Sequence, residues 1–250
     1  AKGIVIGKIK NQLSFMQRIK RKTTEVDAEI QTAITRIKQL IEKAETITSL
    51  ESLRGIEGNA SKWYFSVFRY NIKPSWAEFP NRTKNPPRSN VNAVLSFLYT
   101  VLTTKIHTVL ETQGLDPMAG TLHANAYGAA ALAFDLVEEL RTPIADTLCC
   151  ALFNLGMLKP EDFECADFSP DSSDYPCESE QSEQKVAEAV LLTEEGLKKV
   201  IAAFQEKMNK LAFSGGKKKR ISYNELIFKQ ITVYKNMLNG QQPYTPYYFK

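Results

Sequence analysis

Histidine and cysteine are scarce in this sequence, with 2 histidines and 4 cysteines among 250 residues. The cysteines lack the C-x-x-C spacing of a zinc site, and two of them are adjacent, which hinders separate disulfides in a small fold. We therefore expect reduced thiols and, with them, a cytoplasmic protein. The four cysteines are Cys149, Cys150, Cys165 and Cys177.

Long apolar runs and targeting signals are missing as well. No stretch approaches the length of about 20 apolar residues that a membrane span needs, because Lys, Glu or Thr interrupts the most apolar segments. An integral membrane protein is therefore not expected. The first residues, Ala1-Lys2-Gly3, lack the basic, apolar and small order of a signal peptide, so secretion is unsupported. We expect a chain cut from within a longer protein.

Motifs for nucleotide binding and for covalent catalysis are also missing. Gly215-Gly216 precedes a basic block, but the residues do not follow the order of a phosphate-binding P-loop. The sequence has no G-x-S-x-G, and no Cys and His are placed to form a nucleophilic pair. Nucleotide binding and catalysis by a Ser or Cys nucleophile therefore lack sequence support.

What the sequence does have is enough apolar residues for a core, together with an uneven charge distribution. With 43% hydrophobic and 24% charged residues, it is typical of a globular protein of one to two domains. The net charge is +4, yet residues 2–22 carry Lys and Arg without an acid, and residues 161–183 carry acids without Lys or Arg. A second basic block spans residues 217–220. Basic edges of this kind suit either an anionic polymer or a solvated surface.

Helical periodicity dominates the rest of the chain. Apolar residues over 26–47 alternate in steps of four and three, which predicts a long amphipathic helix facing a core. Residues 3–7, a β-branched run between glycines, are typical of a strand or linker. Prolines over 74–87 predict a long exposed loop. Further helices are predicted from Ser49 or Ser52 to Phe65, and over residues 91–111, 122–140, 188–213 and 223–239.

Glu57 stands out because it lies between Gly55 and Gly58 in an otherwise apolar part of a predicted helix. Each glycine costs a helix about 1 kcal/mol relative to alanine, so two of them beside an acid suggest that a ligand approaches the backbone closely. A metal ion or a phosphate group would meet this description. The alternative is an exposed glutamate on a helix whose glycines only aid packing.

One of the two histidines, His123, is followed by a pair of acids on a predicted helix. Asp135 and Glu138 are three residues apart, which places both carboxylates on one helix face. Oxygen ligands with a single imidazole suit Mg²⁺ or, slightly better, Mn²⁺, and do not suit structural zinc. The alternative is a solvated acidic helix in which Arg141 pairs with Glu138. The other histidine, His107, lacks such acidic surroundings and is expected on an ordinary helix surface.

Several longer motifs occur together in a fixed order. They are Arg54-Gly-Ile-Glu-Gly-Asn-Ala60, Pro86-Pro87 followed by Asn92-Ala-Val-Leu-Ser-Phe97, Gly114-Leu-Asp-Pro117, Leu122-His123, Phe134-Asp-Leu-Val-Glu-Glu-Leu-Arg141 and the closing Tyr244-Thr-Pro-Tyr247. A series of motifs with matching separations is more specific than any one of them. The series closely resembles the helical domain of the universal CRISPR-associated adaptation integrase, the first-numbered family of Cas proteins, over nearly the whole chain.

The resemblance implies a mainly α fold. Residues 25–250 would form an all-α, helical bundle-like catalytic domain, with at most a residual strand or linker at the N-terminus. Residues 1–24 would be a basic linker and the remnant of a β-rich N-terminal domain used for dimerisation. The acidic stretch matches no family motif, and its Ser, Pro and acid content predicts a mobile insertion at about 161–184, outside the core.

The resemblance also implies a catalytic metal, Mg²⁺ or Mn²⁺, held by Glu57, His123 and Glu138, with Asp135 close by in support. Many relatives have Asp in place of Glu138. The ion would polarise a scissile phosphodiester while a DNA 3′-hydroxyl attacks in line, a transesterification without a covalent enzyme intermediate. Alternatively, His123 protonates the leaving oxygen, and the sequence does not separate these two roles.

The implied function is that of a metal-dependent DNA integrase and endonuclease that joins 3′-hydroxyl ends to a CRISPR repeat during spacer acquisition. Two alternatives stay open: a general metal-dependent nuclease, in which water replaces the hydroxyl, and a DNA-holding module without catalysis. The implied partners are double-stranded DNA, a second copy in a homodimer and a small ferredoxin-fold adaptation protein. A fused or associated reverse transcriptase is compatible with the resemblance, and no membrane is expected. The basic residues expected at DNA phosphates are Arg18, Lys20, Arg21, Lys22, Arg54, Lys62 and Arg69.

Overall fold

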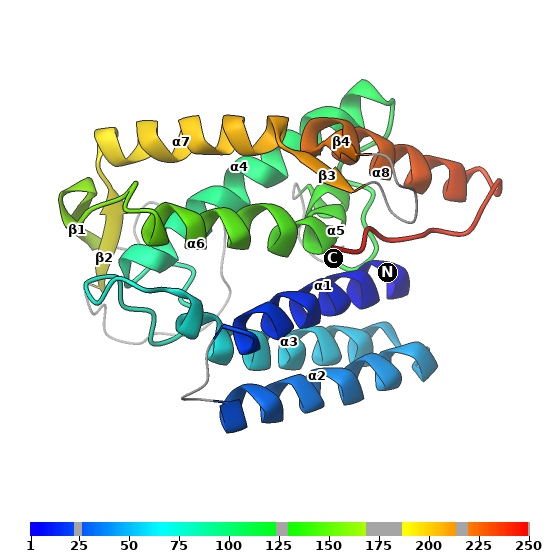
Figure 1. The fold of residues 1–250 in the computed structure, drawn as a ribbon. Helices are drawn as coiled ribbons and strands as arrows, with labels where there is room; N and C mark the ends of the chain where they lie inside the picture. The colour runs from blue at the N-terminus through cyan, green and yellow to red at the C-terminus, as the bar shows by residue number, and fades with distance from the viewer. Residues whose placement is uncertain (23–26, 124–129, 169–186, 214–219, 250) are drawn as a thin grey trace, which may run out of the picture.

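The computed structural model of the chain describes residues 1–22, 27–123, 130–168, 187–213 and 220–249. Within these ranges the fold is mainly helical, as predicted, and the strands are short and form two antiparallel pairs. Figure 1 shows α1, α2 and α3 running side by side, with the later helices on the other side of α1. Because α1 packs against both groups, its residues can contribute to a site between them.

The first three helices, α1, α2 and α3, span Lys2–Lys20, Asp27–Thr46 and Leu50–Phe68. The helices predicted for the second and third of these segments are confirmed. The apolar periodicity of α2 buries Ile30 and Ile37 in the core. Ser49 caps α3, since its side chain accepts a hydrogen bond from the Ser52 N–H at 3.4 Å.

The strand or linker expected at the N-terminus is wrong, because residues 2–20 form α1. β-Branched residues favour strands only in a suitable context, and here Ile4, Ile9 and Ile19 lie on the buried face of a helix. Gly7 lies so close to the C-terminal segment that a Cβ there would be 2.5 Å from Pro246 Cβ. Tertiary packing therefore overrides local propensity in this segment.

A loop over residues 72–89 leads into α4 (Asn90–Thr112). Ser89 caps this helix by accepting from the Asn92 N–H at 3.3 Å, and Gly114 follows its end with a φ of +71°. By length and composition α4 could cross a membrane, a property not expected from the sequence. One face of α4 is buried against α5 and the later helices, as in the core helix of a globular domain.

The chain then passes through α5, a π-helical turn and α6, over Ala131–Leu140, Arg141–Asp146 and Thr147–Asn154. The helix predicted over 122–140 is wrong at its start, because residues 121–123 form a bend. Residues 124–129 of that prediction lie outside the described ranges. The bend forms because the Asp135 carboxylate accepts the backbone N–H groups of residues 121–123, so side-chain hydrogen bonds replace helical ones.

The acidic insertion begins as ordered structure. β1 (Phe163–Phe168) pairs antiparallel with β2 (Ala187–Leu192). Ahead of β1, Asp162 is buried and accepts hydrogen bonds from Lys199 Nζ at 2.7 and 2.8 Å. Residues 161–168 therefore do not form the loop expected of the insertion. The mobility predicted for residues 169–184 concerns a part of the chain outside the described ranges.

The last elements, α7, β3, β4 and α8, span Glu194–Asn209, Leu211–Phe213, Arg220–Ser222 and Tyr223–Leu238. The helix predicted over 188–213 is thus replaced by strand at both ends, whereas the one over 223–239 is confirmed. Of the second basic block, residues 217–219 lie outside the described ranges.

The C-terminal segment, residues 241–249, returns to α1. Asn11 Nδ2 donates to the carbonyls of Glu139 at 2.7 Å and Tyr247 at 2.9 Å, and the Phe249 N–H donates to Asn11 Oδ1 at 2.8 Å. Figure 1 accordingly shows the C-terminal segment passing beside α1. These contacts hold α1, α5 and the C-terminal segment in one arrangement.

Candidate active site

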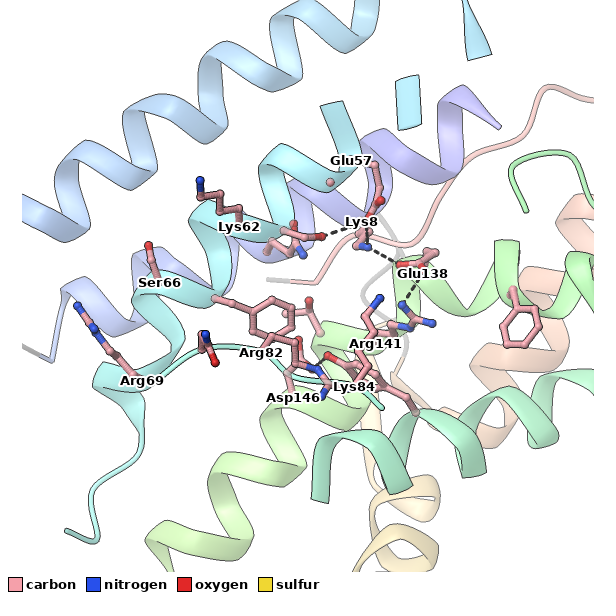
Figure 2. Close-up of a pocket in the computed structure, with 18 of the residues that line it drawn as sticks. Lys8, Glu57, Lys62, Ser66, Arg69, Arg82, Lys84, Glu138, Arg141 and Asp146 are labelled. Atoms are coloured by element: carbon pink, nitrogen blue, oxygen red, sulfur yellow. Dashed lines mark hydrogen bonds and ion pairs between the residues drawn. The ribbon is translucent and has the colours of Figure 1, made fainter. Parts of the chain in front are cut away.

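A cleft of about 880 Å³ opens where α1, α3, α4, α5 and the loop over residues 72–89 meet. It brings together Glu57, His123 and Glu138, the three residues predicted as metal ligands. Figure 2 shows that cationic side chains surround the two glutamates. The other charged residues of the lining are Lys8, Lys62, Arg69, Arg82, Lys84, Arg141 and Asp146.

Glu57 projects from α3 into the cleft and is half-buried. Its Oε1 accepts hydrogen bonds from Ser61 Oγ at 3.0 Å and from Lys8 Nζ. A Cβ added at Gly55 or Gly58 would meet no atom within 4 Å, so close packing in the described structure does not require either glycine. Gly58 lines the cleft, where the missing side chain leaves space for a ligand beside Glu57.

Glu138 lies on α5 with only 3% of its side chain exposed. Its Oε1 is 2.7 Å from a guanidinium nitrogen of Arg141, and its Oε2 is 2.6 Å from Lys8 Nζ. Burial favours the neutral form of this carboxyl, but the positive charges of Arg141 and Lys8 outweigh burial and lower its pKa to about 2. Glu138 is therefore ionised at neutral pH, as a metal ligand must be.

Asp135 fixes the orientation of His123. Its Oδ1 lies 2.8 Å from His123 Nδ1, and its two oxygens also accept backbone N–H groups, among them those of Thr121 and Leu122. Burial opposes its charge, but these hydrogen bonds lower the pKa of Asp135. Because both oxygens are occupied, Asp135 positions the imidazole rather than binding a ligand. With the Nδ1 proton donated to Asp135, His123 Nε2 is the free nitrogen, 3.9 Å from Glu138 Oε1.

The donor set suits a divalent ion of the Mg²⁺ or Mn²⁺ type. Glu138 Oε2 is buried without a partner of hydrogen-bonding geometry, although Lys8 is within ion-pair distance. Glu57 offers a half-buried carboxylate, and His123 offers a free Nε2. No three His, Cys, Asp or Glu residues in the described ranges already stand at metal-binding distances, and Lys8 Nζ lies between the two glutamates. The donor atoms are of the kind that such an ion prefers, and Lys8 Nζ occupies the space between the two carboxylates.

Several residues of the cleft were not predicted from the sequence. The ring of Tyr99 lies 5.4 Å from the Arg82 guanidinium and 4.8 Å from that of Arg141. Buried Asp146 accepts hydrogen bonds from Tyr99 and from Tyr64, each at 2.6 Å, and burial raises its pKa. A buried acid held by two phenols orders this wall of the cleft, with both guanidinium groups beside it.

The signals for two of the missed cations are modest. Arg82 and Lys84 form a basic pair within the proline-rich loop, and such a loop is a common place for binding residues. Lys8 has no such signal, because it lies among the buried side chains of α1 and its partner Glu57 is 49 positions away.

The residues predicted at DNA phosphates separate into those inside and those outside the cleft. Lys62 and Arg69 line it, and Arg69 also pairs with Glu29 at 3.1 Å. Arg54 donates from Nε to the Leu122 carbonyl at 2.7 Å and so supports the bend that carries His123. Arg18, Lys20, Arg21 and Lys22, like Arg54, lie outside the lining, and contact with DNA stays a prediction for all seven residues.

Comparison with known proteins shows the family of the chain. The family model described as "CRISPR associated protein Cas1" matches residues 1–168. The chain belongs to the Cas1 family. It is similar to "CRISPR-associated endonuclease Cas1" of Leptospira interrogans, with 32% identity over 255 residues that cover 100% of this chain and 92% of that protein. "CRISPR-associated endonuclease Cas1 3" of Thermus thermophilus is 32% identical over 99% of this chain and 65% of its own length.

Solved structures share the fold of this Cas1 chain. A chain of the "Cas6-RT-Cas1--Cas2 complex" matches with a TM-score of 0.80 and 25% identity, over 100% of this chain and 25% of that one. The "Casposase bound to integration product" matches with a TM-score of 0.77 and 20% identity, over 100% of this chain and 63% of that one. The match to the casposase concerns the fold alone. In both comparisons this Cas1 chain corresponds to part of a longer protein.

Proposed function

We propose that this Cas1 chain carries the catalytic centre of a CRISPR adaptation integrase, which joins a DNA 3′-hydroxyl to a phosphodiester of a CRISPR repeat. The observation that carries the proposal is the meeting of Glu57, His123 and Glu138, from three separate segments, in one cleft lined by cations. The names of its relatives, Cas1 endonucleases, support cleavage of DNA. The solved structure of the casposase shows that this fold can hold an integration product.

The metal is part of the proposal. Glu57, Glu138 and His123 Nε2 would hold Mg²⁺ or Mn²⁺, which when bound stabilises negative charge at the reacting phosphate and activates the attacking hydroxyl. Asp135 accepts a hydrogen bond from the Nδ1–H of His123 and so keeps the Nε2 lone pair directed to the cleft. In its alternative role, His123 carries a proton on Nε2 and gives it to the leaving oxygen.

The cationic side chains of the cleft suit the phosphate groups of a DNA substrate. Arg82, Lys84 and Arg141 would neutralise the phosphodiester at the centre, and hydrogen bonds from guanidinium groups would orient its oxygens. Lys62 and Arg69, farther along the α3 side, would bind flanking phosphates without reading the bases. This division lets one site act on many DNA sequences.

A comparison of two DNA donors tests the reaction type. A donor ending in a 3′-hydroxyl should be joined to a CRISPR repeat, and the same donor ending in a 2′,3′-dideoxynucleotide should not, because it lacks the nucleophile. Cleavage of the repeat at equal rates with both donors, without joined product, would show that water is the nucleophile and that the chain is a general nuclease.

Assembly and location complete the proposal. The solved complex that matches this chain names Cas2, Cas6 and a reverse transcriptase together with Cas1. We propose that this chain works as a homodimer with a small ferredoxin-fold partner of the Cas2 type, on double-stranded DNA, and that a reverse transcriptase accompanies it. The described cysteines, Cys149, Cys150 and Cys165, are free thiols, which supports a cytoplasmic location.

A further inference from the structure

Lys8 is buried in α1 at the wall of the cleft, with 7% of its side chain exposed. A lysine is almost never buried to this extent unless its charge is paired. Figure 2 shows its ammonium between Glu57 and Glu138, joined to both by dashed lines. Lys8 Nζ donates to Glu57 Oε1 and lies 2.6 Å from Glu138 Oε2.

These two oxygens belong to the carboxylates that would hold the divalent ion. Two partly or fully buried carboxylates that face one another repel unless a cation lies between them. Arg141 is engaged at the other oxygen of Glu138, Oε1, at 2.7 Å. Lys8 is therefore the cation that joins the two glutamates across α3 and α5.

An ammonium and a divalent ion cannot occupy the space between the same two carboxylates, since both are positive and both need the same lone pairs. We infer that Lys8 is a displaceable internal counter-ion of the metal site. It holds Glu57 and Glu138 together before metal binds, and Mg²⁺ or Mn²⁺ displaces it. This inference rests on the metal site proposed above.

After it is displaced, the ammonium of Lys8 still lies within the cleft, because Lys8 is part of the lining. Its four-carbon stem is flexible, so the charged group can turn from the carboxylates toward the open side. There it adds a positive charge where a DNA phosphate would bind. Loading of metal and binding of DNA would thus favour one another.

The test is a titration of the whole chain with Mn²⁺. Binding is detected as the loss of the electron paramagnetic resonance signal of free Mn²⁺, and thermal melting is measured in parallel. Lys8→Met keeps the apolar stem and removes the charge. Lys10→Met is the matched control, because Lys10 lies on the same helix, is 37% exposed and pairs with Glu45 at 3.3 Å. We expect Lys8→Met to lower the melting temperature without metal and to bind Mn²⁺ about ten-fold or more tightly, because no paired ammonium has to be displaced. The control should match the unmodified chain in both measurements.

Glu57→Gln separates failure of this inference from failure of the metal site. If Glu57→Gln loses Mn²⁺ binding while Lys8→Met binds Mn²⁺ no more tightly than the unmodified chain, the counter-ion inference is overturned and the metal site stands. If neither Glu57→Gln nor Lys8→Met changes Mn²⁺ binding, the counter-ion inference and the proposed metal site are both overturned. Should Lys8→Met fail to fold, Lys8→Gln, which keeps a hydrogen-bond donor, takes its place with the same expected gain in Mn²⁺ affinity.

Discussion

The carboxylate of Asp135 accepts hydrogen bonds from the backbone of residues 121–123 and from the ring of His123. We predict that Asp135→Asn slows DNA joining by about 10- to 100-fold, the usual effect of losing a residue that orients a metal-binding histidine. DNA affinity should stay unchanged, because Asp135 is buried and does not line the cleft. Nitrogen-15 NMR of His123 should show a change in tautomer, and a normal rate with an unchanged tautomer would contradict the positioning role.

The two glycines that flank Glu57 provide a matched pair. Neither would place a Cβ near another atom, so alanine at either position should stabilise α3 by about 0.5–1 kcal/mol, measured by urea unfolding. Only Gly58 lines the cleft. We predict that Gly58→Ala reduces DNA joining and that Gly55→Ala does not. Equal activity in both variants would mean that no ligand approaches the backbone at Gly58.

At the scale of residues, the sequence pointed to the three residues that meet in the cleft but not to the lysine between two of them. Glu57, His123 and Glu138 were accessible through their motifs, and the structure places them in one cleft. Lys8 was not accessible, because its partner Glu57 lies 49 positions away and no local pattern joins them. A pair that forms only through tertiary packing leaves no spacing rule in the sequence.

At the scale of elements, one buried acid, Glu139, helps to hold the C-terminal segment. Glu139 on α5 accepts hydrogen bonds from the Tyr244 hydroxyl at 2.8 Å and from the Tyr247 N–H at 3.3 Å. Burial raises the pKa of Glu139 from 4.5 to about 8. The folded chain therefore holds this proton more tightly than the unfolded chain, so the resulting stabilisation is full below pH 4.5 and is lost as the pH rises through 8.

We predict that Glu139→Gln, which resembles the protonated acid, raises the free energy of unfolding relative to the unmodified chain at a pH above 8 but not below 4.5. Urea unfolding at both pH values measures the difference. Glu206→Gln is the control, since Glu206 is 67% exposed and should show no such dependence. The same effect of Glu139→Gln at both pH values would contradict the raised pKa.

Helices with a capping residue and a clear apolar periodicity could be predicted from the sequence. The other elements could not. Ser49 and Ser89 begin α3 and α4 as their sequences indicate. The prediction for α5 begins too early because the carboxylate of Asp135, on α5 itself, holds the preceding bend through its side chain. The isoleucines near the N-terminus have high strand propensity and so predict a strand or linker over residues 3–7, but burial against α2, α3 and α5 overrides this preference in α1.

For the whole molecule, charge distribution matters more than the net charge of +4. If DNA lies in the cleft, each phosphate contact adds about 0.9 to the slope of log affinity against log salt concentration. We predict that replacing Lys62 and Arg69 with Ala together flattens this slope by about 2. Replacing Lys198 and Lys210, which are exposed and outside the lining, should leave the slope unchanged. Equal slopes for both double variants would place the DNA elsewhere.

The catalytic centre is tested most directly by measuring DNA joining and DNA binding on the same donor and repeat, with Mg²⁺ or Mn²⁺ present. Glu57→Gln, His123→Ala and Glu138→Gln should each abolish joining, as should EDTA. Each should keep DNA affinity within a few-fold, because separate cations of the cleft, such as Lys62 and Arg69, are the predicted phosphate contacts. Joining that persists in His123→Ala or in either glutamate variant would contradict a single centre built from these three residues.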